Sequence, residues 1–174
     1  MVEIRFLSNK TRKKAYTYIW LSVLAIISWL LQISVFSYTL VLDTTPSLIF
    51  FGCIFCGIKY GAKYGTFFGI ISSFFSASIL YDHIFMISYP VIGFASGIFS
   101  KNIFSDEIMS FAFLNLIFTP VIEALNGWQY SFNNEANILN RYLLVASIGT
   151  IINLFLSPVY YIILKFISQR LKVW

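Results

Sequence analysis

The segment Ala15–Leu42 contains no charged side chain, and this constrains the chain more than any other feature. A helix needs about 20 apolar residues to cross the hydrocarbon core of a bilayer. The whole chain is 59% hydrophobic and only 11% charged, whereas soluble domains carry about 25% charged residues. The sequence therefore predicts an integral membrane protein. The run is too long for the apolar core of a signal peptide, so we expect it to be a retained first span.

Five further apolar segments follow the first one. We predict one all-α transmembrane domain over residues 1–174, with six spans at about 15–42, 46–59, 61–80, 83–100, 109–125 and 142–167. The second span is short for a full crossing. The longest connection, residues 126–141, is polar, and we expect it to be an external loop.

The positions of the basic residues predict the orientation. With six spans and the N-terminus inside, eleven of the twelve Lys and Arg residues fall on the cytoplasmic side, and only Arg141 falls outside. This follows the positive-inside rule. We therefore expect a multi-pass membrane protein with both termini in the cytoplasm and with basic residues that face acidic membrane lipids rather than nucleic acid.

Small residues recur every fourth position from the second span into the third. The stripe consists of Gly57, Gly61, Gly65, Gly69, Ser73 and Ala77, and a shorter case, Gly93 and Gly97, lies in the fourth span. Glycine inside a helix costs about 1 kcal/mol relative to alanine, but small residues four apart let two helix backbones approach closely in lipid. These residues predict helix packing within the chain, or an interface with a partner or a second copy. Gly57 and Gly61 also suit the turn between the two spans.

Catalytic or metal-binding residues are few. Cys53 and Cys56 have the spacing of redox and zinc motifs, but they lie in an apolar run without a second ligand pair, so we interpret them as buried structural residues. His83 is the only histidine, and Glu123 lies near the end of the fifth span. An ionisable residue at membrane depth indicates a functional site unless it reaches water at a span end. We expect no enzyme activity, no metal and no cofactor.

Three segments carry a family resemblance. The block PSLIFFGCIFCGIKYGAKYGTFFGIISSFFSASILY (46–81) resembles the central block of MreD, the bacterial rod shape-determining membrane protein. The segment IGFASGIFSK (92–101) looks like a glycine element that ends a later span of that family. The segment INLFLSPVYYIILKFISQRLK (152–172) is similar to its closing span.

The resemblance implies a non-enzymatic scaffold of the cell-elongation complex in the bacterial inner membrane, which directs peptidoglycan synthesis and cell shape. It implies MreC as the direct partner, with RodA, a class B penicillin-binding protein and MreB in the wider complex.

The predicted six-span bundle also resembles the S-components of energy-coupling-factor vitamin transporters, which supply an alternative function. A vitamin-binding subunit would use the external segment 126–141 and a polar pocket that contains Glu123, His83 and Trp128. S-components carry two alanines four residues apart in the first span, for docking on the transporter. Here Ala25 is flanked at that interval by Leu21 and Trp29, so the sequence favours the scaffold.

Overall fold

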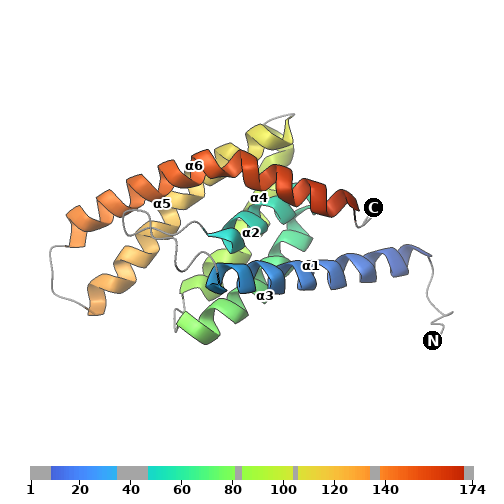
Figure 1. The fold of residues 1–174 in the computed structure, drawn as a ribbon, viewed down its shortest axis with the longest axis horizontal. Helices are drawn as coiled ribbons and strands as arrows, with labels where there is room; N and C mark the ends of the chain where they lie inside the picture. The colour runs from blue at the N-terminus through green and yellow to red at the C-terminus, as the bar shows by residue number, and fades with distance from the viewer. Residues whose placement is uncertain (1–8, 35–46, 81–83, 104–105, 134–137, 171–174) are drawn as a thin grey trace.

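The computed structural model describes residues 9–34, 47–80, 84–103, 106–133 and 138–170. Within these ranges the chain forms six α-helices and no strand (Figure 1). They are α1 (Asn9–Ser34), α2 (Leu48–Tyr60), α3 (Ala62–Leu80), α4 (Ile84–Ile103), α5 (Glu107–Asn133) and α6 (Ile138–Arg170). The predicted all-helical class is confirmed for the described residues.

Three of the helices are long and apolar enough to cross a membrane. The apolar stretches are Lys14–Ser34 in α1, Glu107–Leu125 in α5 and Ala146–Gln169 in α6. The segment expected as an external loop, 126–141, is mostly helical, because α5 continues to Asn133 and α6 begins at Ile138. No proline lies between Pro120 and Pro158, so every backbone N–H in this segment remains available to extend a helix.

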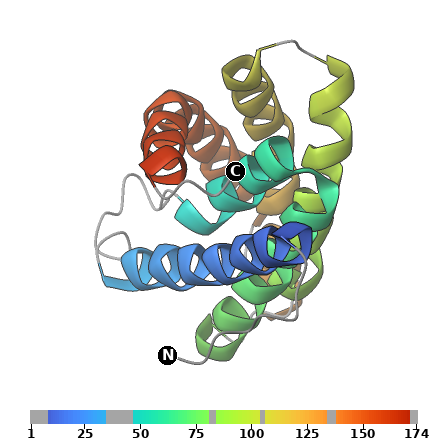
Figure 2. The ribbon, with the colours of Figure 1, turned by 90° about the vertical axis from the view of Figure 1, so that its right-hand side faces the viewer.

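The short helix α2 lies at the centre of the molecule, between α1 and α6 (Figure 2). Its 13 residues span about 20 Å, less than the roughly 30 Å of the hydrocarbon core. Two of the first N–H groups of α2 bond to side chains. The Leu48 N–H donates to the Gln32 side-chain oxygen at 2.8 Å, and the Phe50 N–H donates to the Ser47 hydroxyl at 3.3 Å. Every residue from Ile49 to Gly57 is buried.

Aromatic side chains fill the space between α2, α5 and α6. Phe51 stacks on Tyr160 with ring centroids 4.7 Å apart, and Phe55 contacts Tyr161 edge-on at 5.7 Å. Phe111 of α5 lies 5.4 Å from Tyr161. Fully burying a side chain of this size stabilises a fold by about 1.5–3 kcal/mol. This cluster therefore joins α2 to the α5–α6 pair.

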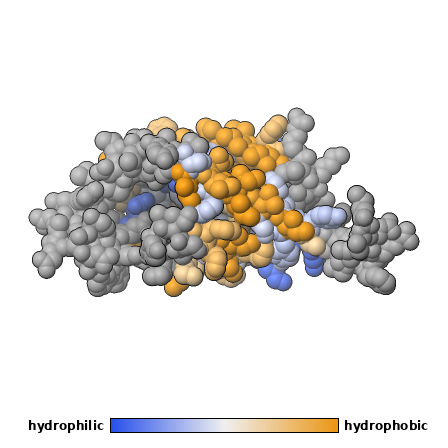
Figure 3. All heavy atoms as spheres, turned by 60° about the horizontal axis from the view of Figure 1, so that its bottom comes forward, coloured by the Kyte–Doolittle hydropathy of each residue, from blue (hydrophilic) through white to orange (hydrophobic). Residues whose placement is uncertain are grey.

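The outward faces of the helices are apolar. Figure 3 shows a band of hydrophobic residues across one face, with hydrophilic residues along its right-hand edge. Exposed side chains in such bands include Ile19, Val23 and Leu30 of α1, Ile70 and Phe74 of α3, and Phe155, Ile162 and Phe166 of α6. Helix α1 begins, and α6 ends, at the same end of the molecule (Figure 1). The outer surface has the composition that lipid requires.

Candidate functional site

The glycine stripe lies where α3 crosses α4. A Cβ added to Gly65 would overlap the carbonyl oxygen of Gly93, and a Cβ added to Gly93 would overlap that of Gly65. Neither helix could carry a side chain at this point without moving its neighbour's backbone. The two backbones are in direct contact, which is the arrangement that small residues permit between helices in lipid.

The same contact extends along both helices and onto α2. A Cβ at Gly69 would lie 2.5 Å from the Tyr89 carbonyl oxygen, and one at Gly57 would lie 2.6 Å from that of Gly93. Gly97 packs directly on the backbone of Ala62. The structure therefore places these glycines in a three-helix contact of α2, α3 and α4 within the chain.

Gly61 has a different role from its neighbours in the stripe. Its φ of +92° lies in a region that side chains with a Cβ rarely adopt. Its N–H donates to the Gly57 carbonyl at 2.9 Å and ends α2, while its own carbonyl accepts from Tyr64 and Gly65 at the start of α3. Gly61 thus makes the turn. Further along, Ser73 is buried and its hydroxyl donates to the Ile70 carbonyl, whereas the Ala77 side chain lies outside the described residues.

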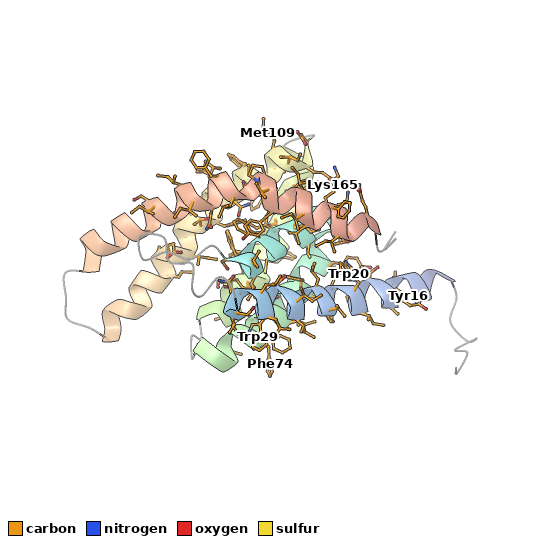
Figure 4. All side chains as sticks on the ribbon, in the orientation of Figure 1. Tyr16, Trp20, Trp29, Phe74, Met109 and Lys165 are labelled. Carbon is orange, nitrogen blue, oxygen red and sulfur yellow. The ribbon has the colours of Figure 1, made fainter. Side chains whose placement is uncertain are left out.

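A charged cluster joins the turn between α2 and α3 to the α5–α6 pair. The Lys59 ammonium lies 3.2 Å from Oε1 of Glu107 and 3.3 Å from Oε2. The hydroxyl of Tyr161, whose side chain is fully buried, donates to Glu107 Oε2. The Lys165 ammonium lies 5.7 Å from the centre of the Tyr161 ring, on α6 as labelled in Figure 4. One carboxylate therefore links three helices.

Polar side chains also form a seam between α5 and α6. Along α5, Asn115 and Thr119 follow one another at an interval of four, and Asn153 and Ser157 do the same along α6. All four are buried. The Asn153 amide donates to the Thr119 hydroxyl at 3.5 Å. Side chains four apart share one helix face, so the two polar stripes meet where the helices pack.

Two acceptors in this seam, the Leu154 carbonyl and Asn115 Oδ1, differ in whether they have a hydrogen-bond donor. Pro158 cannot donate to the Leu154 carbonyl, and the Ser157 hydroxyl donates to that carbonyl instead, at 2.8 Å. The Asn115 amide donates to the Phe111 carbonyl at 2.7 Å, but its Oδ1 has no partner among the described residues. An unsatisfied buried acceptor costs about 1–3 kcal/mol.

Of the three residues of the expected polar pocket, only the Glu123 side chain lies within the described residues. Glu123 is half-buried on α5, one turn beyond Thr119. His83 and the Trp128 side chain lie outside the described residues. Cys53 and Cys56 are buried free thiols. Among the described residues, no group of His, Cys, Asp and Glu side chains is suited to hold a metal ion.

Sequence reasoning overlooked both the Lys59–Glu107–Tyr161 cluster and the α5–α6 seam. The seam had a signal, because Asn115 and Thr119 stand four apart in an otherwise apolar run. The cluster had none, since Lys59 and Glu107 are far apart in the chain and only the packing of α2 on α5 and α6 makes them neighbours. Comparison of the chain with known protein families, curated proteins and solved structures found no match.

Proposed function

We propose that this protein is a non-catalytic scaffold of the bacterial cell-elongation complex, which binds the single-span protein MreC in the inner membrane. RodA, a class B penicillin-binding protein and MreB belong to the wider complex. The segments 46–81, 92–101 and 152–172, which resemble MreD, are the basis of the partner assignment. On this proposal all six helices lie in the membrane, and both termini are cytoplasmic.

One observation favours a scaffold over a solute-binding subunit. The space around α2 is occupied by the large apolar side chains of Phe50, Phe51, Phe55 and Phe111, each no more than 2% exposed. A small-molecule site needs a concave surface with a few convergent polar groups. A centre filled with packed aromatic rings instead gives a rigid body, and a rigid body presents its outer faces to other helices at low entropic cost.

The position of the described lysines supports the proposed orientation. Lys59 and Lys165 meet around Glu107 and Tyr161, and Lys63 lies just beyond the turn from Lys59. Lys14 lies where the apolar stretch of α1 begins. These four residues come from four helices: Lys14 lies near the start of α1 and Lys165 near the end of α6, while Lys59 and Lys63 flank the turn between α2 and α3. Helix α1 begins and α6 ends at one end of the bundle (Figure 1). A single basic end is what a cytoplasmic face requires.

The scaffold proposal is tested by co-expression with MreC from the same genome. We expect the tagged protein to retain MreC through purification in mild detergent. Two triple variants locate the MreC-binding face. One replaces Leu154, Ile162 and Phe166 on the outer face of α6 with arginine, and the other replaces Ile19, Val23 and Leu30 of α1; the amount of MreC retained is compared between them. Failure of the wild-type protein to retain MreC would contradict the proposal.

The transporter alternative is tested on the same purified sample. Mass spectrometry of the denatured protein reports any vitamin that co-purifies. We expect no stoichiometric thiamine, riboflavin or folate, because the side chains that surround α2 leave few polar groups to hold one. A bound vitamin at one equivalent, together with lost MreC, would establish the S-component function instead.

A further inference from the structure

Two lysines precede the aromatic contacts that join α1 to α3. Tyr18 of α1 contacts Phe67 of α3 edge-on, with ring centroids 4.7 Å apart. Further along both helices Trp29 contacts Phe75 at 5.3 Å, so α1 and α3 run in the same direction. Lys14 lies four residues before Tyr18, and Lys63 lies four residues before Phe67. Residues four apart share a helix face, so each lysine lies on the face of its helix that carries this contact, one turn before the contacting ring.

The charge of this pair is not balanced by the helices that carry it. Neither α1 nor α3 contains an Asp or Glu residue, and α1 has three more basic residues before Lys14, at Lys10, Arg12 and Lys13. Lys14 and Lys63 are both exposed, and no ion pair connects either to an acidic group among the described residues. The contrast is with Lys59, which is paired with Glu107. Two exposed ammonium groups at the starts of two packed helices attract an anion.

The surface next to Lys63 indicates which anion fits. Ile70 and Phe74 follow Lys63 by seven and eleven residues, which returns them to nearly the same face of α3, and they are 53% and 66% exposed. Tyr64 lies beside the lysine and contacts Tyr18 at 5.1 Å. Along this face of α3 a lysine is followed by tyrosines and then by exposed apolar side chains. A phospholipid presents the matching groups in the same order: a headgroup phosphate, the membrane interface and an acyl chain.

We propose that the lysine pair Lys14–Lys63 binds the headgroup phosphate of an acidic phospholipid, with an acyl chain lying over Ile70 and Phe74. The site does not depend on the scaffold function, and it is distinct from the Lys59–Glu107 cluster on the other side of α2. A lysine at an acidic membrane surface contributes a factor of about five in affinity, so the pair contributes a factor of about thirty.

Native mass spectrometry of the detergent-purified full-length protein tests the site. The protein is titrated with phosphatidylglycerol and with phosphatidylcholine of the same acyl chains. We expect wild type to prefer phosphatidylglycerol, and the double variant Lys14→Gln, Lys63→Gln to bind it about thirty-fold more weakly. The double arginine variant keeps both charges and should keep the preference. Melting temperatures of the variants verify that each one is folded.

The positional control is Lys165→Gln, which removes one positive charge from the same end of the molecule but on α6, whereas the double variant removes two. We expect it to lower phosphatidylglycerol binding by less than about fivefold. A loss of about fivefold in Lys165→Gln, which is the same loss per charge as in the double variant, would show non-specific attraction and overturn the proposal. Unchanged binding in the double variant would also overturn it. Displacement of the lipid by excess inorganic phosphate would overturn the acyl-chain contact.

Discussion

Replacement of Gly69 by leucine tests the close contact between α3 and α4 directly. An added Cβ at Gly69 would lie 2.5 Å from the Tyr89 carbonyl oxygen, 2.6 Å from the Tyr89 carbonyl carbon and 2.7 Å from Pro90 Cα. A Cβ contact under 3.0 Å essentially never occurs and ordinary contacts begin at 3.4 Å, so the helices must part, by about 0.9 Å if this contact is to become an ordinary one. All three atoms belong to the backbone, and therefore no side-chain rotation relieves the overlap.

A separation of this size weakens every contact along the crossing. A gap of about 0.5–1 Å removes a quarter to a half of the dispersion energy of each atom pair, and overpacking costs about 1–3 kcal/mol. Leucine has a helix propensity better than glycine by up to about 1 kcal/mol. Because leucine adds three more carbons beyond the Cβ, we place the loss at the upper end and expect a net destabilisation of about 2 kcal/mol.

The assay is thermal unfolding of the purified protein in detergent. A loss of about 2 kcal/mol lowers the melting temperature by about 4–8 °C in a chain of this size. The control is Ala124→Leu, which introduces the same side chain at an exposed position of α5 and should leave the melting temperature nearly unchanged. Leucine favours a helix more than glycine does, so helix propensity alone would raise the melting temperature of Gly69→Leu. A lowered melting temperature therefore reports the overlap with α4. An unchanged or raised melting temperature for Gly69→Leu would show that this face of α3 meets lipid and not α4.

Three further predictions concern the charged cluster, the polar seam and the orientation. Glu107→Ala should lower the melting temperature more than Tyr161→Phe, because alanine leaves both the buried hydroxyl and the neighbouring ammonium without their acceptor; equal effects would contradict the bridging role of the carboxylate. Asn115→Leu should raise the free energy of unfolding by about 1 kcal/mol, because it removes the unsatisfied Oδ1. Asn153→Leu should lower it by about 0.6 kcal/mol, because the hydrogen bond to α5 is lost. If thermal unfolding shows both variants destabilised, the Asn115 Oδ1 is not an unsatisfied acceptor. A cysteine placed at Asn134 should react with an impermeant maleimide added outside intact cells, and labelling from the cytoplasmic side alone would reverse the orientation.

Local patterns in the sequence were sufficient to predict the helical class and the residues of the α3–α4 contact. Lipid offers no hydrogen-bond partner to the backbone, so long apolar runs with few charges predict helices, in which the N–H and C=O groups bond to each other. These runs are recognisable in the sequence alone. The four-residue spacing of Gly57, Gly61, Gly65 and Gly69 predicted a close backbone contact. The sequence left open whether the contact was internal, and the packing of α4 on this face answers that question for Gly57, Gly65 and Gly69.

The tertiary structure alone decided how the helices are joined and where they end. Lys59, Glu107 and Tyr161 meet only because α2 packs on both α5 and α6, and no local pattern encodes a contact between residues so far apart in the chain. The same holds for the register that sets Thr119 against Asn153. The polar segment 126–141 was expected to be a loop from its composition, yet α5 continues to Asn133. The polarity of a segment indicates whether its side chains face water or lipid. Whether a helix continues depends on backbone hydrogen bonds, which polar residues make as well as apolar ones do.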